Sequence, residues 1–145
     1  MTAPVLASVH VRRSPVDAFR VFTDRIGDWW PLPTHGCFGS EAAGLGFDDG
    51  RLVERSADGD VAVWGEVLAW EPPRRFVVTW HPGRSGGPHS VVEVEFRPDE
   101  DGTRVALTHS GWEAYGDRAE ERRAAYEGPD AWVLVLGLFR TAAEG

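Results

Sequence analysis

The chain has 145 residues and a net charge of −8, and its 15 basic side chains are all arginine. The absence of lysine excludes enzymes that use a lysine Schiff base and phosphate-binding loops that need a lysine. The absence of asparagine excludes N-glycosylation sites and a Cys-His-Asn protease, and the acidic balance argues against nucleic acid or an anionic membrane as partner.

The composition is typical of one globular domain with a substantial core. Hydrophobic residues make up 42% of the chain, which contains seven tryptophans. A chain of this length buries enough surface to fold without a disulfide, and Cys37 has no second cysteine with which to pair. The chain contains no secretory signal pattern and no apolar run long enough to span a bilayer. We therefore expect a single domain over residues 1–145, located in the cytoplasm, with no membrane insertion.

The first elements are predicted to be a strand and two short helices. Valine-rich alternation over residues 5–12 predicts the strand. Ser14 is a good N-cap, Pro15 suits the first helical position, and the apolar spacing that follows predicts a helix ending near Asp24. Residues 26–30 are expected to form a second short helix. Pro31 and Pro33 follow closely and would end it.

A run of short strands is predicted for the middle of the chain. Residues 32–50 are glycine-rich and are expected to form a long loop that carries one short strand. β-rich segments separated by turn signals then follow at residues 51–56, 61–70, 75–80, 90–97 and 104–110. Consecutive short strands with tight breaks indicate an antiparallel meander.

The C-terminal part is predicted to be helical. Residues 117–126 are charged and fit one or two solvated helical turns. The segment 131–143 has apolar residues at helical spacing and others off that stripe, so its helix is apolar nearly all round. Such a helix is either buried on most sides or contacts a partner, which leaves a homodimer open.

These elements predict an α+β fold. A curved antiparallel sheet of about six to seven strands would wrap around the long C-terminal helix, and the two short helices after the first strand would close one end. Space would remain between the sheet and the helix.

The sequence resembles the START-like (SRPBCC) superfamily, in the branch of the activator of the ninety-kilodalton heat-shock protein ATPase. The segments that carry the resemblance are SPVDAF at 14–19, WWP at 29–31, WGEV at 64–67, EPPRRFVVTW at 71–80 and GTRVALTHSGW at 102–112. The resemblance implies a helix-grip fold with a cavity between the sheet and the C-terminal helix. It does not specify a function, because the superfamily includes lipid carriers, antibiotic-binding proteins and aromatic cyclases.

Strand alternation predicts which side chains face this cavity. The inward sets are expected to be Val92, Val94 and Phe96; Val105, Leu107 and His109; and Phe76, Val78 and Trp80. The facing of the 61–70 strand stays open, because Trp64 shares a face with Glu66 and the opposite face is also apolar.

Aromatic side chains are the main functional clue, since they could line a pocket for an apolar or aromatic ligand. The alternative is that most of them simply form the core. The candidate ligand-binding residues are Trp29, Trp30, Phe38, Trp64, Phe76, Val78, Trp80, Val94, Phe96, Leu107, His109, Trp132, Leu136 and Phe139.

Few residues are candidates for chemistry. His109 could contact a ligand or act as an acid–base group, or it could be a core histidine with satisfied hydrogen bonds. The five histidines and Cys37 have no metal-site spacing, and no nucleotide-binding glycine motif or serine nucleophile elbow occurs. Cys37 is interpreted as a small loop residue. We expect no metal and no cofactor.

Three functions remain open. The favoured one is a protein that holds a small hydrophobic or aromatic molecule in the cavity without covalent chemistry. The alternative is a cyclase or dehydratase acting on an aromatic or polyketide-like substrate, with His109 or Glu66 as the acid–base group. A further alternative is a stress-related or chaperone-associated interaction protein, although this chain is too short for the additional chaperone-contacting domain of the namesake family.

Overall fold

A computed structural model describes residues 2–84 and 86–145, and its strands form one antiparallel sheet. These strands are β1 (Val5–Val11), β2 (Ala42–Asp48), β3 (Arg51–Ser56), β4 (Val61–Glu71), β5 (Arg75–Trp80), β6 (Ser90–Asp99) and β7 (Gly102–Ser110). Their order across the sheet is β1-β7-β6-β5-β4-β3-β2. The predicted meander is therefore confirmed, with the first strand paired to the last.

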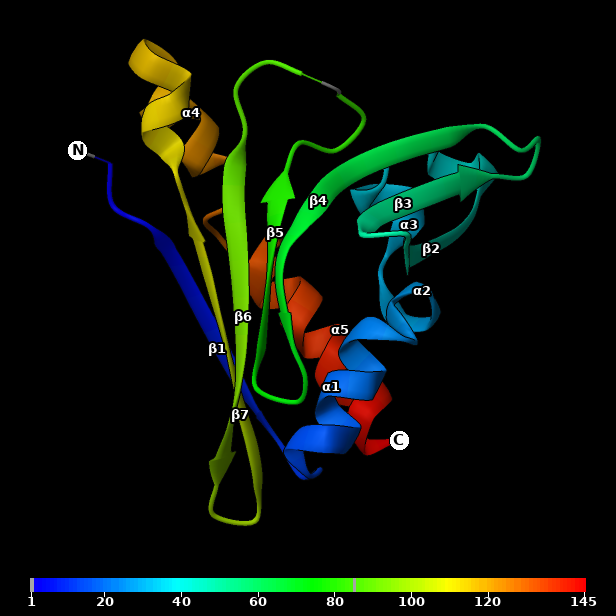
Figure 1. The fold of residues 1–145 in the computed structure, drawn as a ribbon, viewed down its shortest axis with the longest axis vertical. Coiled ribbons are helices and arrows are strands. Elements are labelled where there is room, and N and C mark those ends of the chain that lie inside the picture. The colour runs from blue at the N-terminus through cyan, green and yellow to red at the C-terminus, as the bar shows by residue number, and fades with distance from the viewer. Residues whose placement is uncertain (1, 85) are drawn as a thin grey trace.

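The helices are α1 (Pro15–Thr23), α2 (Ile26–Trp29), α3 (Leu32–His35), η1 (Gly39–Glu41), η2 (Trp112–Arg118), α4 (Ala119–Ala124) and α5 (Trp132–Glu144). Of these, α1 and α5 lie on the concave side of the sheet, whereas α4 lies beyond one end of the strands (Figure 1). The sheet curls around α5, and α1 lies beside α5. This arrangement confirms the predicted α+β helix-grip fold.

One segment is more structured than expected. Residues 32–50 contain the predicted strand β2, but they also form the one-turn helix α3 and the 3-10 turn η1. Pro33 occupies an early position of α3, where a missing backbone N–H costs nothing. The buried side chain of Leu32 holds this turn against the core, which a glycine-rich sequence alone did not reveal.

The predicted strand faces are correct for β5, β6 and β7. The side chains expected to face inward are all less than 9% exposed, including His109 at 0%. The facing of β4 has no single answer, because its pairing shifts register near Trp64 and again near Leu68. As a result Trp64 is buried while Glu66 and Leu68 are exposed. A bulge changes which face a residue occupies, so regular alternation could not settle this strand.

The space between α5 and the middle of the sheet is filled by aromatic rings. Phe22 lies 4.9 Å from Phe139 and 5.7 Å from Phe76, measured between ring centroids. Phe22 also lies 5.1 Å from Trp29. These separations are those of directly packed aromatic pairs. The interior at this level is therefore a packed core.

The outer side of α5 is partly apolar. Val133 is 65% exposed and Leu134 is 37% exposed, as expected for a helix that is apolar nearly all round. The homodimer through this helix stays a prediction.

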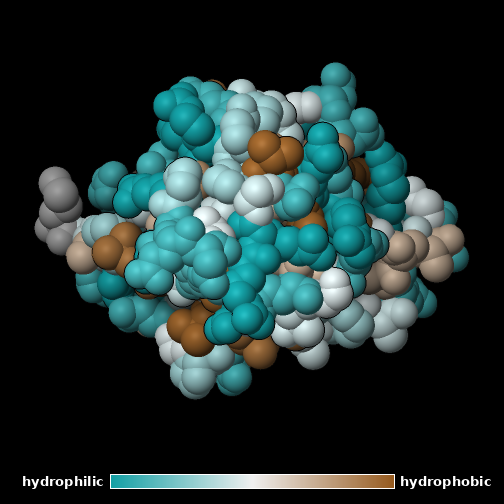
Figure 2. All heavy atoms as spheres, turned by 90° about the horizontal axis from the view of Figure 1, so that it is seen from below, coloured by the Kyte–Doolittle hydropathy of each residue, from teal (hydrophilic) through white to brown (hydrophobic). Residues whose placement is uncertain are grey.

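Figure 2 shows the molecule from below, where hydrophilic residues cover most of the face and hydrophobic residues form small separate groups. Among the described residues, no helix is long and apolar enough to cross a membrane.

Helix α1 begins with the predicted cap. The Ser14 Oγ accepts a hydrogen bond from the Asp17 backbone N–H at 3.2 Å. Replacing Ser14 with alanine should therefore lower the free energy of unfolding by about 1 kcal/mol. The measurement is urea unfolding followed by tryptophan fluorescence. Ser14→Asp preserves the cap and should keep the wild-type stability; equal stability of Ser14→Ala and wild type would contradict the assignment.

Candidate functional site

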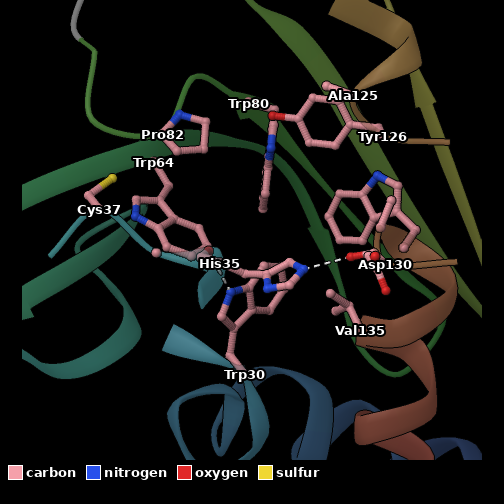
Figure 3. A pocket seen from close by; sticks show the side chains of 13 residues that line it. Trp30, His35, Cys37, Trp64, Trp80, Pro82, Ala125, Tyr126, Asp130 and Val135 are labelled. Atoms are coloured by element: carbon pink, nitrogen blue, oxygen red, sulfur yellow. Dashed lines mark hydrogen bonds between the residues drawn. The ribbon is translucent and has the colours of Figure 1, made fainter. Parts of the chain in front are cut away.

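A pocket of about 390 Å³ lies between α3, the first half of β4, the end of β5 and the start of α5. Figure 3 shows side chains from these separate segments directed toward one space. The residues that line it are Trp30, His35, Gly36, Cys37, Trp64, Trp80, Pro82, Ala125, Tyr126, Asp130, Ala131, Trp132 and Val135. The volume is within the range of pockets that hold small molecules.

Four tryptophans form a ring of neighbouring side chains in the pocket wall. Trp64 lies 5.2 Å from Trp30 and 5.6 Å from Trp80, measured between ring centroids. Trp132 lies 5.8 Å from Trp30 and 5.2 Å from Trp80, which completes the ring. All four are less than 9% exposed. They give the pocket a rigid apolar wall with several aromatic faces and edges.

The carboxylate of Glu54 fixes one side of this wall. Its Oε1 accepts hydrogen bonds from the Trp64 indole N–H at 3.1 Å and from the Cys37 backbone N–H at 2.7 Å. Its Oε2 accepts from the Phe38 backbone N–H at 3.3 Å. The side chain is fully buried, so these donors take the place of water around its charge. Glu54 thereby ties the loop after α3 to the tryptophan wall.

The thiol of Cys37 lies beside this carboxylate. Burial raises the pKa of the Cys37 thiol, and the negative charge of Glu54 raises it further. The thiol is therefore protonated at neutral pH and is a poor nucleophile. This environment agrees with the interpretation of Cys37 as a loop residue rather than a catalytic one.

His109 lies behind the pocket wall and does not line the pocket. The Trp132 indole N–H donates to its Nδ1 at 3.0 Å. Because an indole nitrogen can only donate, the His109 proton is on Nε2, which lies 2.7 Å from Ser90 Oγ. Burial lowers the pKa of His109 to about 3. A neutral ring with both nitrogens engaged supports Trp132 and is not placed for acid–base chemistry.

His35 joins two segments of the pocket wall that are distant in the sequence, the end of α3 and the residues before α5. The His35 Nε2 lies 2.6 Å from the Asp130 carbonyl oxygen, and its Nδ1 lies 2.8 Å from Thr34 Oγ1. The dashed line in Figure 3 marks the contact with Asp130. The His35 carbonyl also accepts from the Trp30 indole N–H at 3.1 Å. The contact between His35 and Asp130 holds the end of α3 against the segment that precedes α5.

The structure separates the predicted ligand-binding residues into three groups. Those that line the pocket are Trp30, Trp64, Trp80 and Trp132. Those around a much smaller interior space are Phe76, Val78, Val94 and Leu107, together with Trp30, Trp80 and Trp132. Those that line neither space are Trp29, Phe38, Phe96, His109, Leu136 and Phe139. Their roles in ligand binding stay predictions.

The interior space cannot hold a ligand as it stands. Its volume is about 10 Å³, which is at the lower limit for a single water molecule. Glu66, the other acid–base candidate, is exposed to solvent and lines neither space. This pocket therefore provides room for a small molecule at the end of β5, near the start of α5, and the deep interior does not.

Several residues that line the pocket or support its wall were not predicted. Glu54 could have been recognised, because it alternates with Leu52 and Ser56 on an otherwise buried face. Tyr126 belongs to a charged segment that looks like solvated helix, and its contact with Trp132 depends on the chain folding back. His35 and Asp130 are 95 residues apart, so no local pattern connects them.

The sequence profile described as "Activator of Hsp90 ATPase homolog 1-like protein" matches residues 12–131. The chain belongs to this family. The START-like resemblance, in its heat-shock ATPase activator branch, is thereby confirmed. Comparison with curated proteins gave no significant match.

Three solved structures place this family member among its relatives. An anthrahydroquino-γ-pyrone synthase, Txn09 complexed with SUM, is 35% identical and covers 97% of both chains, with a TM-score of 0.64. The self-sacrificing resistance protein CalC from Micromonospora echinospora is 22% identical over 97% of this chain and 94% of its own, with a TM-score of 0.69. The Aha1 dimer from Colwellia psychrerythraea is 17% identical over 99% and 97%, with a TM-score of 0.62. The last two show the fold alone.

Side chains that could bind a metal ion do not cluster in the part of the chain that the structure describes. Within residues 2–84 and 86–145, no group of three His, Cys, Asp or Glu side chains could hold a metal ion. The polar side chains that line the pocket are His35, Cys37, Tyr126 and Asp130, and the Trp80 indole N–H and backbone groups lie beside them.

Proposed function

We propose that this protein binds a planar aromatic molecule in the tryptophan-lined pocket. The observation that carries the proposal is the cluster of packed tryptophans, Trp30, Trp64, Trp80 and Trp132, which lines one side of a pocket of about 390 Å³. A flat ring system can stack on one indole and meet the edge of the next, and each such contact adds to the burial of apolar area. An alkyl chain would gain burial but not these ring contacts.

Rigidity of the wall supports the same conclusion. The indole N–H groups of Trp30, Trp64 and Trp132 donate to a carbonyl, a carboxylate and a histidine respectively. Side chains that are held in place before binding lose little conformational entropy when a ligand arrives. The Txn09 relative supports an aromatic ligand, because it is named as an anthrahydroquino-γ-pyrone synthase.

Titration with 1,8-dihydroxyanthraquinone tests this function. We expect saturable quenching of tryptophan fluorescence with a Kd on the order of 10–100 µM, and a rise in melting temperature with ligand concentration. Decan-1-ol, which has no carboxylate, serves as the aliphatic comparison and should bind more weakly. No quenching by the anthraquinone and no change in melting temperature would overturn the proposal.

A matched pair of variants locates the binding. Ala125 is exposed and lines the pocket, whereas Ala124 is exposed and does not. Ala125→Phe should fill part of the pocket and raise the Kd at least about tenfold, while Ala124→Phe should leave it within about twofold. Both positions are at the surface, so both variants should melt near the wild-type temperature. Equal Kd values for the two variants would place the ligand elsewhere.

A second candidate is an enzyme that closes a ring on such a molecule. The specific observation in its favour is the 35% identity to an anthrahydroquino-γ-pyrone synthase over nearly all of both chains. Tyr126 is the pocket group best suited to donate a hydrogen bond to an oxygen that gains negative charge in the reaction, because burial raises the pKa of its hydroxyl and keeps it protonated. Tyr126→Phe should then abolish turnover of an aromatic substrate, as followed by mass spectrometry, and retain binding. Full turnover by this variant would exclude Tyr126.

A further inference from the structure

Two arginines converge on one tyrosine ring beside the pocket. The Cζ of Arg122, on α4, lies 5.0 Å from the centroid of the Tyr115 ring, and the Cζ of Arg84 lies 6.0 Å from it. The Arg84 guanidinium also donates to the Tyr115 hydroxyl at 3.5 Å. Arg84 comes from the segment between β5 and β6, so two distant parts of the chain bring these charges together.

Neither arginine is neutralised by the part of the protein that the structure describes. Within it, no carboxylate oxygen lies within 4.0 Å of a nitrogen of Arg84 or Arg122. The neighbouring Arg118 and Arg123 are both paired with glutamates. The chain has 23 acidic residues and 15 arginines, so partners are abundant. Two adjacent guanidinium groups that have no acidic partner form a local positive site on an acidic protein.

This positive site adjoins the pocket. Arg84 follows the lining residue Pro82 by two positions, and Arg122 precedes the lining residue Tyr126 by four. Burial raises the pKa of the Tyr126 hydroxyl, and a hydrogen bond with the Trp80 indole opposes this rise, as do the charges of Arg122 and Arg84 to a smaller extent. Both guanidinium groups therefore lie close enough to act on a charge held beside Tyr126.

A poorly satisfied donor occupies the same side of the pocket. The buried indole N–H of Trp80 has no hydrogen bond of regular geometry among the described residues, and the Tyr126 hydroxyl is the acceptor beside it. Trp80 is only 5% exposed and lines the pocket. Figure 3 shows the Tyr126 hydroxyl directed toward this indole. A buried N–H without a well-placed acceptor costs free energy, which an acceptor oxygen of a ligand would recover after a small shift of Tyr126.

We propose that the aromatic ligand carries a carboxylate, that this carboxylate lies between Arg84 and Arg122, and that an adjacent oxygen of the ligand accepts from the Trp80 indole. The inference rests on the proposed function and adds to it the chemical class of the ligand, an aromatic acid. Guanidinium groups suit this role because they pair with carboxylates through parallel N–H donors.

A matched pair of probes tests the charge. Anthraquinone-2-carboxylate and anthraquinone-2-carboxamide have the same ring system and nearly the same size, and only the first is anionic at pH 7. Tryptophan quenching should give a Kd for the acid about tenfold lower than that for the amide. The difference should shrink as sodium chloride is raised, because salt screens the charges at the rim.

The arginines are tested by the double variant Arg84→Gln/Arg122→Gln. It should remove the preference for the acid and leave the Kd of the amide within about twofold. Arg97→Gln is the control, since it changes the net charge in the same sense. Arg97 lies seven residues along β6 from Ser90, which is roughly 23 Å, and it should keep the full preference.

The outcomes separate this inference from the function on which it rests. If both probes bind equally well, or if the preference survives in the double variant, the inference is wrong and the aromatic pocket stands. If neither probe binds, the proposed function fails and this inference fails with it. If the acid binds better and the double variant loses that preference, both are supported.

Discussion

Glu54→Leu is expected to lower the free energy of unfolding by about 3–5 kcal/mol. The carboxylate is fully buried and accepts from the Trp64 indole and from two backbone N–H groups. Leucine has a similar size but no acceptor, so it leaves the buried Trp64 indole N–H without a partner, at a cost of about 1–3 kcal/mol, and the part-buried N–H groups of Cys37 and Phe38 lose theirs as well. Relaxation of the loop that carries Cys37 should return some of these donors to water. Urea unfolding followed by far-UV circular dichroism measures the loss.

The neighbouring strand provides the control for this substitution. Glu66 is exposed on β4, and Glu66→Leu should change the stability by less than about 0.5 kcal/mol. If Glu54→Leu is too unstable to purify, Glu54→Gln can be measured in its place. It retains one acceptor oxygen, so its free energy of unfolding should fall by less than that of Glu54→Leu. Similar stabilities for Glu54→Leu and Glu66→Leu would contradict the role assigned to the buried carboxylate.

His109 should make the stability fall as the pH is lowered from 6.5 toward 3. In the unfolded chain this histidine takes up a proton near pH 6.5, whereas burial lowers its pKa in the folded protein to about 3. Between these values the unfolded state holds one more proton, so acid favours unfolding. In this range, His109 lowers the free energy of unfolding by up to about 1.4 kcal/mol for each pH unit.

The variant His109→Gln isolates that contribution. Glutamine has no group that titrates, so the stability of the variant should depend less steeply on pH than that of the wild type. The variant itself should be less stable at pH 7, because it loses the packing of the His109 ring. The centroid of that ring lies 4.2 Å from the ring centroid of Trp112 and 4.5 Å from that of Tyr126. The measurement is urea unfolding at several values between pH 4 and 7. Parallel curves for the two proteins would show that His109 titrates normally in the folded state.

The sequence was sufficient for the fold because its signals are local. Alternation along β6 places Val92, Val94 and Phe96 inward whatever the neighbouring strands do. Capping by Ser14 and the apolar spacing of α5 are local in the same way. The facing of β4 was not predictable, since its two register shifts depend on β3 and β5.

The pocket was predictable in kind but not in place. Its tryptophans were all among the predicted residues, because large aromatic side chains either fill a core or line a cavity. Which of the two occurs depends on how the rings pack. Phe22 and Phe139 pack directly against one another and fill the deep interior, while the space remains at the start of α5. Packing of that kind is a property of the whole molecule.

The indole N–H resonances of the seven tryptophans test the central claim most directly. Each tryptophan gives one such signal, and substitution of each by phenylalanine assigns it. On addition of 1,8-dihydroxyanthraquinone, the signals of Trp30, Trp64, Trp80 and Trp132 should shift. Those of Trp29, Trp70 and Trp112, which do not line the pocket, should shift little. Larger shifts for the second group, or no shifts in the first, would contradict the assignment of the pocket as the binding site.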